Sequence, residues 1–212
     1  MMRGLPIIIA APSGCGKGTV IPLVIKELER AVYSVSCTTR SPRAGEEDGS
    51  DYFFITREEF EERIARGEML EYNEYVGNLY GTPLYETQER LGSGLDVIFE
   101  VDVNGAENIR RRLEGAVSVM ILPPSFGVLR KRLEGRGTDS PEVIEKRLKK
   151  ALDEIERLPS FDYYVINRDG MPDRCARDIL GIITAERRRT SRNSDLTNKF
   201  KNGESLITRE ER

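Results

Sequence analysis

A short apolar run that passes into a glycine-rich turn constrains this chain more than any other feature. The β-branched residues Ile7, Ile8 and Ile9 lead into a loop and then a helical pattern, with the loop reading Ala11-Pro12-Ser13-Gly14-Cys15-Gly16-Lys17-Gly18-Thr19. Strand, loop and helix in this order are what a phosphate-binding P-loop requires. Its glycines let successive backbone N–H groups converge on one anion, and the helix N-terminus adds positive partial charge. We therefore predict that residues 11–19 bind phosphate groups and that Lys17 reaches the outer ones.

The fit to the P-loop pattern G-x-x-x-x-G-K-[ST] is imperfect at both ends. Ala11 stands where the first glycine is expected, and Gly18 replaces the hydroxyl residue, which follows one place later as Thr19. A chance Gly/Lys turn is the alternative explanation. The order of strand, loop and helix favours the phosphate site.

Composition limits the classes of protein to which the chain can belong. Its 212 residues suffice for one core with small inserted subdomains, and 33% of them are charged, which is typical of a soluble globular protein. A net charge of −3 gives no electrostatic footprint for nucleic acid. The sequence has neither an apolar run as long as a membrane span nor a signal-peptide pattern. We expect small-molecule partners, no nucleic acid and no membrane, and the oligomeric state stays open.

Cysteine and histidine usage narrows the chemistry further. The cysteines Cys15, Cys37 and Cys175 are odd in number and lack metal-ligand spacing, which predicts a reducing, cytoplasmic location. There is no histidine, so the usual general base is absent. Cys15 lies near a helix start, where a thiol can be acidic, but a small residue that fills its position is the simpler interpretation.

Strand and helix patterns alternate along most of the chain. Strands are predicted at 32–36, 52–55, 68–76, 96–102, 117–122 and 161–167, with a turn at 77–83. Helices are predicted at 19–31, from Thr56, around Leu84 and Leu91, at 105–113, from Ser125, from Ser140 and at 172–188. Five or more strands that alternate with helices predict a three-layer α/β fold with a parallel sheet.

Residues 189–212 have a different character. They are polar and weakly periodic, with six basic and four acidic side chains. We predict a frayed, solvated C-terminal tail. An RNA-binding arm is the alternative, which the small charge excess disfavours.

Several short motifs of the chain occur together in one known family. They are Ser36-x-Thr38-Thr39-Arg40-x-Pro42-Arg43-x-Gly45-Glu46, Gly77-Asn78-x-Tyr80-Gly81-Thr82, Glu100-Val101-Asp102-x-x-Gly105, Leu122-Pro123-Pro124-Ser125 and Arg132-Leu133-x-Gly135-Arg136-Gly137-Thr138. Together with the P-loop, they make roughly residues 5–188 resemble the guanylate kinases. The resemblance implies one domain over 1–188, with a P-loop kinase core at 1–36 and 94–188. Within it, a GMP-binding insertion is implied at 37–93 and a helical lid at about 126–150.

The resemblance also implies an activity. It indicates an ATP:(d)GMP phosphotransferase of purine nucleotide metabolism, which converts ATP and GMP into ADP and GDP. Kinases for another nucleoside monophosphate or for a phosphorylated sugar are alternatives, which the region around Glu71 would distinguish. A guanylate-kinase-like scaffold domain that binds peptides without catalysis is a further alternative. Lys17, the loop glycines and the lid arginines favour the enzyme, because a peptide-binding module does not need them.

Two loop arginines are candidates for the GMP phosphate. Arg40 and Arg43 offer paired guanidinium donors to phosphate oxygens, and the family match adds Tyr52 and Tyr80. Solvated arginines and a buried core tyrosine are the structural alternatives.

A glutamate is the candidate for reading the base. Guanine presents N1–H and N2–H donors that one carboxylate accepts together, whereas adenine would leave a buried carboxylate unpaired. The resemblance places Glu71 at the base, with help from Ser36, Thr82 and Asp102. A surface glutamate on a strand is the alternative.

Basic residues after the last motif are implied as a lid. Arg132, Arg136 and Arg147 would bring positive charge onto the transferring phosphoryl group, with Gly135 and Gly137 as hinges; an ordinary basic helix face is the alternative. The acceptor phosphate is already charged near neutral pH, since its second pKa is about 6, so no base is needed.

Magnesium is the expected cofactor, between the β- and γ-phosphates of ATP. Because Gly18 lacks a hydroxyl, we expect Mg²⁺ to be held by Thr19, Glu100 and Asp102, in part through water.

Overall fold

A five-stranded parallel sheet forms the centre of the computed structural model, which describes residues 3–75, 77–135 and 140–206. The strands run in the order β2-β7-β1-β8-β9, with bounds Ala31–Tyr33, Asp96–Val101, Pro6–Ala10, Val117–Leu122 and Tyr163–Ile166. All four neighbouring pairs are parallel. Their carboxyl ends therefore meet at one edge of the sheet, where ligands bind in folds of this class.

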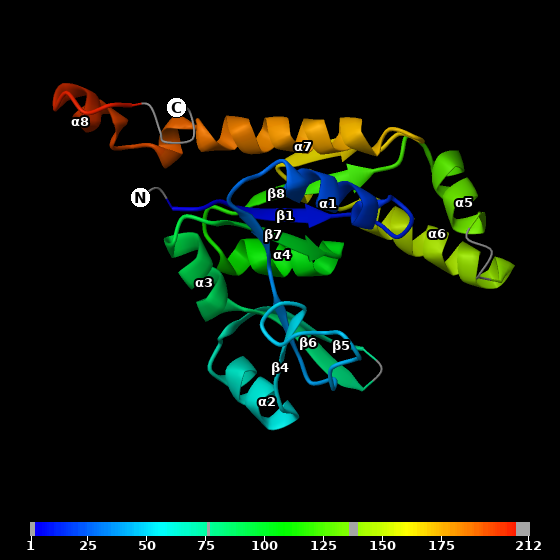
Figure 1. The fold of residues 1–212 in the computed structure, drawn as a ribbon. Helices are drawn as coiled ribbons and strands as arrows, with labels where there is room; N and C mark the ends of the chain where they lie inside the picture. The colour runs from blue at the N-terminus through cyan, green and yellow to red at the C-terminus, as the bar shows by residue number, and fades with distance from the viewer. Residues whose placement is uncertain (1–2, 76, 136–139, 207–212) are drawn as a thin grey trace.

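Side chains of β1 alternate between two helical layers. Ile7 and Ile9 belong to the cluster that includes buried residues of α1 and α7, whereas Ile8 and Ala10 pack with residues of α3 and α4. Figure 1 shows α7 and α4 on opposite sides of the sheet. These helices are α1 (Lys17–Lys26), α3 (Leu84–Gly92), α4 (Val103–Arg112) and α7 (Pro172–Arg187). The predicted three-layer α/β fold with a parallel sheet is confirmed.

A second, four-stranded sheet lies below the first in Figure 1. Its order is β4-β3-β6-β5, with bounds Tyr52–Phe54, Ser36–Thr38, Asn78–Pro83 and Met69–Tyr75. Helix α2 (Arg57–Ala65) packs on this sheet through Phe60, which contributes to a separate small core with Cys37, Met69 and Leu79. As predicted, Thr56 caps α2, its hydroxyl accepting the Glu59 N–H at 3.1 Å.

Three of the predicted elements differ from the structure. The strand expected at 32–36 is split, because β2 ends at Tyr33 in the large sheet and β3 begins at Ser36 in the small one. The turn expected at 77–83 is instead strand β6, which pairs with both β3 and β5. The first helix ends at Lys26 rather than at residue 31, since the Arg30 carbonyl already accepts the Asp96 N–H at 2.8 Å.

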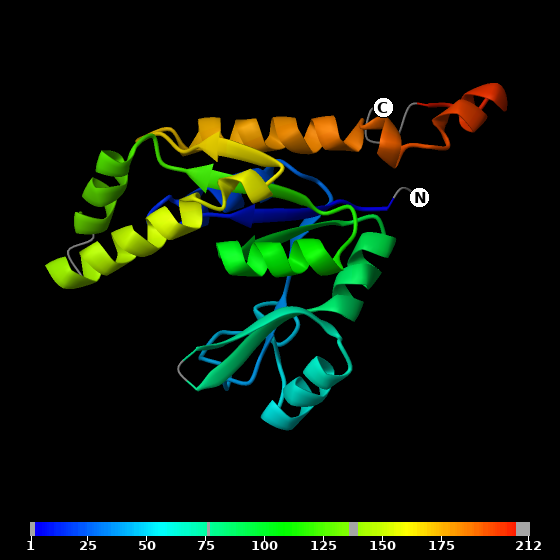
Figure 2. The same cartoon turned by 180° about the vertical axis from the view of Figure 1, so that it is seen from behind.

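Two helices extend beyond the carboxyl edge of the large sheet. They are α5 (Phe126–Glu134) and α6 (Pro141–Ile155), capped by Ser125 and Ser140 as their sequences predict. Figure 2 shows both projecting past the tip of β1. Leu129 and Leu133 of α5 and Leu148 of α6 join the core cluster beside α1. The predicted lid region is thus built on this edge.

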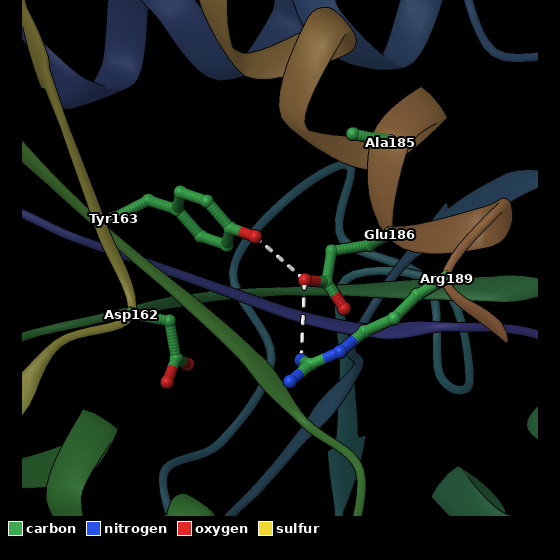
Figure 3. A pocket seen from close by; sticks show the side chains of 5 residues that line it. All are labelled: Asp162, Tyr163, Ala185, Glu186 and Arg189. Atoms are coloured by element: carbon green, nitrogen blue, oxygen red, sulfur yellow. Dashed lines mark hydrogen bonds and ion pairs between the residues drawn. The ribbon is translucent and has the colours of Figure 1, made fainter. Parts of the chain in front are cut away.

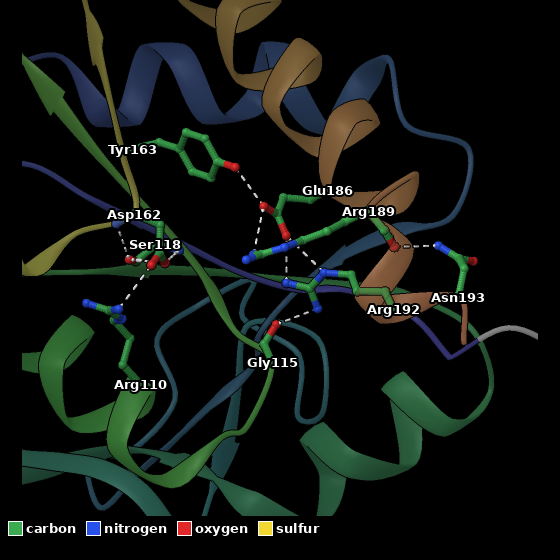
Figure 4. A network of polar contacts seen from close by, with 9 residues as sticks. All are labelled: Arg110, Gly115, Ser118, Asp162, Tyr163, Glu186, Arg189, Arg192 and Asn193. Atoms are coloured by element: carbon green, nitrogen blue, oxygen red, sulfur yellow. Dashed lines mark hydrogen bonds and ion pairs between the residues drawn. The ribbon is translucent and has the colours of Figure 1, made fainter. Parts of the chain in front are cut away.

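The first part of the predicted tail is ordered on the core, not frayed. Arg192 donates to Glu186 Oε2 at 2.9 Å and to the Gly115 carbonyl at 2.9 Å, so it joins α7 to the loop before β8 (Figure 4). Glu186 is only 3% exposed and also accepts the Tyr163 hydroxyl at 2.6 Å (Figure 3). A buried carboxylate that needs a cation explains why the chain stays attached beyond α7. The short α8 (Leu196–Lys201) then points away from the sheet.

The Glu186 network borders a cavity of about 520 Å³. Tyr163 begins β9, so this cavity lies at the amino end of the strands, away from the P-loop edge. Asp162 is held by Ser118 and Arg110 (Figure 4). The structure also has two short 3-10 helices, η1 (Leu158–Ser160) and η2 (Thr190–Arg192). Within the described residues, no helix is long and apolar enough to cross a membrane.

Candidate active site

The glycine-rich loop lies between β1 and α1, as predicted. Gly14 and Gly16 have φ angles of 90° and 84°, in the left-handed region that side chains with a Cβ disfavour. Gly16 is the N-cap of α1, so the N-terminal N–H groups of this helix open onto the loop. A Cβ at Gly14 would lie 3.0 Å from both Leu129 and Leu133 of α5. The loop is therefore held closely against α5, and its geometry suits an anion.

Lys17 is the first residue of α1 and points along the loop toward β7. Its Nζ donates to the Val101 carbonyl at 2.7 Å. Burial lowers the pKa of Lys17, while the nearby carboxylates of Glu100, Asp102 and Glu154 oppose that shift. The ammonium thus lies at the junction of β1 and β7, where a phosphate chain held by the loop would end.

Two carboxylates follow at the end of β7. Glu100 is exposed, and Asp102 caps α4 by accepting the Gly105 N–H at 2.8 Å through Oδ1, which leaves its other oxygen available. Thr19 is exposed in the first turn of α1. Among the described residues, no three acidic, histidine or cysteine side chains form a metal cluster. Mg²⁺ usually takes only one or two carboxylates together with waters and substrate phosphates, so this donor set fits it.

Arg40, which follows β3 of the small sheet, is held in a fixed orientation. Its Nη1 and Nη2 each donate to a different oxygen of Glu46 at 2.9 Å. The guanidinium lies over the Tyr52 ring, 5.5 Å from its centroid, and the Tyr52 and Tyr80 rings are 6.0 Å apart. The hydrogen bond from Arg40 and one from the Arg43 N–H keep the pKa of Glu46 below its ordinary value. Three of the four residues expected at the GMP phosphate therefore meet side by side.

Arg43 hydrogen-bonds to this group through its backbone, since its N–H donates to Glu46 at 2.7 Å, and its side chain is exposed. Glu46 orients the guanidinium of Arg40 and holds the backbone at Arg43, and sequence analysis missed it although it ends the quoted motif. The available signal was a glutamate close in sequence to the two arginines, because a carboxylate can accept two hydrogen bonds from one guanidinium.

Three of the four residues expected at the base lie on adjacent strands of the small sheet, and the fourth, Asp102, follows β7 of the large sheet. Glu71 of β5 is opposite Thr82 of β6 in the register, and the Thr82 hydroxyl donates to Glu71 Oε1 at 2.7 Å. Burial raises the pKa of Glu71, the Thr82 hydrogen bond opposes this, and the Asp102 charge raises it further. Ser36 begins β3, next to β6, and is half-buried. The half-buried carboxylate has acceptor capacity left for a ligand.

The lid arginines divide into three cases. Arg132 of α5 donates to Asp169 through Nε at 2.9 Å and to the Asn167 carbonyl through Nη2 at 2.8 Å. Arg147 is half-buried on α6. Arg136 and the hinge residue Gly137 lie outside the described residues.

Cys15 is fully buried in the loop, and burial raises the pKa of its thiol to about 12. Burial thus disfavours the thiolate, and Cys15 packs as a small apolar residue in the core cluster. Its carbonyl accepts the Asn167 side-chain N–H at 2.8 Å. Asn167 and Asp169 were not singled out from the sequence, although residues just after the last parallel strand are where ligand sites form.

Comparisons with known proteins show which proteins this chain resembles. The family model described as guanylate kinase matches residues 3–181. A guanylate kinase of Listeria innocua serovar 6a is 46% identical over 191 residues, 90% of this chain and 92% of the relative. One from Streptococcus pneumoniae serotype 4 is 49% identical over 185 residues, 87% and 88% of the two chains. The crystal structure of guanylate kinase from Anaplasma phagocytophilum has a TM-score of 0.66 at 32% identity, over 90% of each chain.

Proposed function

The chain belongs to the guanylate kinase family, whose members are ATP:GMP phosphotransferases, and we propose the residues through which it transfers the ATP γ-phosphoryl group to GMP. ATP lies in the P-loop, residues 11–19, and GMP lies on the small sheet within the insertion 37–93. The core is formed by 1–36 and 94–188, and the lid by about 126–150. This division is supported by the two separate sheets and their separate cores.

One observation carries the assignment of the acceptor base. Glu71 and Thr82 form a hydrogen-bonded pair at 2.7 Å on adjacent strands, and the carboxylate is half-buried beside Asp102. Guanine offers two adjacent donors, N1–H and N2–H, that satisfy this carboxylate. Adenine offers an acceptor at N1 and would leave the charge unpaired, at a cost of about 1–3 kcal/mol. Ser36 and Asp102 complete the base site.

The GMP phosphate is bound by the aromatic and guanidinium group that Arg40, Tyr52 and Tyr80 form on the same small sheet. Glu46 fixes two nitrogens of Arg40, and Tyr52 and Tyr80 flank it. A guanidinium fixed in this way forms charge-assisted hydrogen bonds with little loss of rotamer freedom. Arg43 supplies a second, exposed cation.

The transfer needs no general base from the protein. A GMP phosphate oxygen is already charged near neutral pH and attacks the γ-phosphorus directly, with ADP as the leaving group. The loop N–H groups and Lys17 hold the donor phosphates, and Arg132, Arg136 and Arg147 stabilise charge on the transferring group. The absence of histidine from the sequence agrees with this mechanism.

Thr19, Glu100 and Asp102 would hold Mg²⁺, in part through water, since Gly18 has no hydroxyl. When bound, the ion neutralises charge on the β- and γ-phosphates. All three cysteines are buried and unpaired, which supports a reducing compartment such as the cytoplasm.

ADP release from ATP and Mg²⁺ with GMP, dGMP, AMP, CMP or UMP as acceptor tests this function. We expect turnover with GMP and dGMP and about 5- to 150-fold less with the other nucleotides, as a penalty of about 1–3 kcal/mol implies. Turnover that favours AMP would contradict the role of Glu71. Folded protein without turnover on any nucleotide would support the non-catalytic scaffold domain.

A further inference from the structure

Asn167 lies where the P-loop meets the lid helix. It follows β9 and is only 6% exposed. Its side-chain Nδ2 donates to the Cys15 carbonyl at 2.8 Å, and its backbone N–H donates to the Leu122 carbonyl at 2.9 Å. One buried amide therefore fixes the phosphate loop to the carboxyl edge of the sheet.

The carbonyl of the same residue holds a lid arginine. Arg132 Nη2 donates to the Asn167 carbonyl at 2.8 Å and to Asp169 Oδ1 at 2.6 Å, and its Nε donates to the same Asp169 oxygen at 2.9 Å. Two of the three guanidinium nitrogens are thereby fixed. The side chain of Arg132 is 20% exposed, while that of Asp169 is 67% exposed, so the carboxylate holds the arginine from the solvent side.

Among the residues that the structure describes, the third nitrogen of Arg132 has no hydrogen-bond partner. Nη1 is buried and makes no hydrogen bond within the described part of the chain. A buried charged donor without an acceptor is costly, and a bound ligand is one way in which proteins resolve it. Helix α5 lies directly on the phosphate loop, since a Cβ at Gly14 would be 3.0 Å from Leu133, the neighbour of Arg132.

We propose that Asn167 and Asp169 are positioning residues for phosphoryl transfer, which hold two nitrogens of Arg132 so that Nη1 is presented to a phosphate oxygen of the bound nucleotide. Asn167 fixes the loop and the arginine at once, so the two groups that contact the phosphates keep a constant separation. Pre-organised charge of this kind lowers the barrier without reorganisation during the reaction. The proposal rests on the proposed function.

Asp169→Asn is the first test, because this exposed side chain can be changed without disturbing the core. We expect kcat to fall about 10- to 100-fold, with KM for GMP within twofold of wild type and an unchanged melting temperature. Asp178→Asn, an exposed carboxylate on α7, is the matched control and should leave all three values unchanged. An Asp169→Asn enzyme with kcat within twofold of wild type would overturn the proposal.

A double-variant comparison separates positioning from other roles. If Asp169 acts through Arg132, adding Asp169→Asn to Arg132→Ala causes no further loss of kcat. Losses that multiply would overturn the proposal.

A second readout does not depend on turnover. In the unliganded protein, the Arg132 Nε proton should exchange slowly with water in wild type and quickly in Asp169→Asn. Equal exchange rates in the two proteins would contradict the proposal that Asp169 holds Arg132. Wild-type protein that does not phosphorylate GMP would instead overturn the proposed function, and this proposal with it.

Discussion

The Thr82 hydroxyl donates a hydrogen bond to the Glu71 carboxylate at 2.7 Å, across the β5–β6 register. Burial raises the pKa of Glu71, so the ionised form is held in an environment that disfavours it. Thr82 satisfies only part of the acceptor capacity of the carboxylate. A ligand that brings two N–H donors relieves this cost, and a ligand that brings none adds to it.

The raised pKa of Glu71 predicts how GMP binding depends on pH. The base site needs the ionised carboxylate, so affinity should decrease as pH falls through a value above the ordinary 4.5. We would measure the Kd for GMP from pH 8 to pH 5 by calorimetry, for wild type and Glu71→Gln. The GMP phosphate, with its second pKa of about 6, titrates in both proteins, so the difference between the profiles isolates Glu71.

The folding stability should depend on pH in the opposite direction to GMP binding. A carboxyl group whose folded pKa is raised contributes its full stability below the unfolded value, and that stability is lost as pH rises through the folded value. Unliganded wild type should therefore lose stability relative to Glu71→Gln between pH 4.5 and the raised pKa. Parallel pH profiles of the two proteins, in binding or in unfolding, would show that Glu71 does not titrate as described.

Glu46→Gln should weaken GMP binding without touching the donor site. Removing the charge loosens Arg40, whose two nitrogens Glu46 now fixes at 2.9 Å. A guanidinium that is no longer pre-oriented binds phosphate less well, so we expect KM for GMP to rise about 10-fold, with KM for ATP unchanged. The neighbouring exposed Glu47→Gln is the control. Equal effects of the two substitutions would mean that Glu46 does not act through Arg40.

The alternation of strands and helices could be predicted because it depends on local pattern. Strand Val117–Leu122 matches its predicted bounds and the capped helices after Ser125 and Ser140 begin where predicted, since apolar runs and caps are encoded within a few residues. Strand β6 could not be predicted in this way. Gly81 and Asn78 within it, and Gly77 just before it, favour a turn, and only the antiparallel partners β3 and β5 make it a strand.

Gly16→Ala should damage the phosphate loop. Gly16 has a φ of 84°, and a Cβ there would lie 2.4 Å from Asn167 Nδ2. The left-handed backbone alone costs a residue with a Cβ about 1–2 kcal/mol, and the clash would break the bond to Cys15. We expect a lower melting temperature and a KM for ATP raised at least 10-fold.

Gly181→Ala is the control, because its Cβ meets none of the described atoms within 4 Å and it lies in α7. It should stabilise the fold by about 0.5–1 kcal/mol; a stable Gly16→Ala protein with normal ATP binding would refute this account of the loop.

Arg192→Ala tests whether the segment after α7 is part of the fold. Burial alone would raise the pKa of Glu186, but bonds from Tyr163 and Arg192 keep it below its ordinary value. Without Arg192 the free energy of unfolding should fall by about 1.5–3 kcal/mol near neutral pH. Arg177→Ala, an exposed arginine on α7, should change it by less than about 0.5 kcal/mol. Equal unfolding curves for Arg192→Ala and wild type would show that this segment does not stabilise the fold and behaves as the solvated tail predicted from the sequence.

Some contacts could not be predicted from the sequence because they join distant parts of the chain. Arg40 and Lys17 stand in recognisable motifs, and the family resemblance points to Glu71, so these residues could be named one by one. Asn167 and Cys15 are 152 residues apart, and their hydrogen bond depends on β9 ending beside the loop. The Arg192–Glu186 pair likewise depends on a carboxylate that becomes buried only when α7 packs on β9. Neither pair leaves a local pattern that a reader of the sequence could use.

The ratio of kcat/KM for GMP to that for AMP, in wild type and Glu71→Gln, tests the central claim most directly. Glu74→Gln, an exposed glutamate on the same strand, is the matched control. We predict a ratio that falls at least 10-fold in Glu71→Gln, mainly through a higher KM for GMP, and stays at the wild-type value in Glu74→Gln. An unchanged ratio in Glu71→Gln would contradict the claim that this carboxylate reads the guanine base.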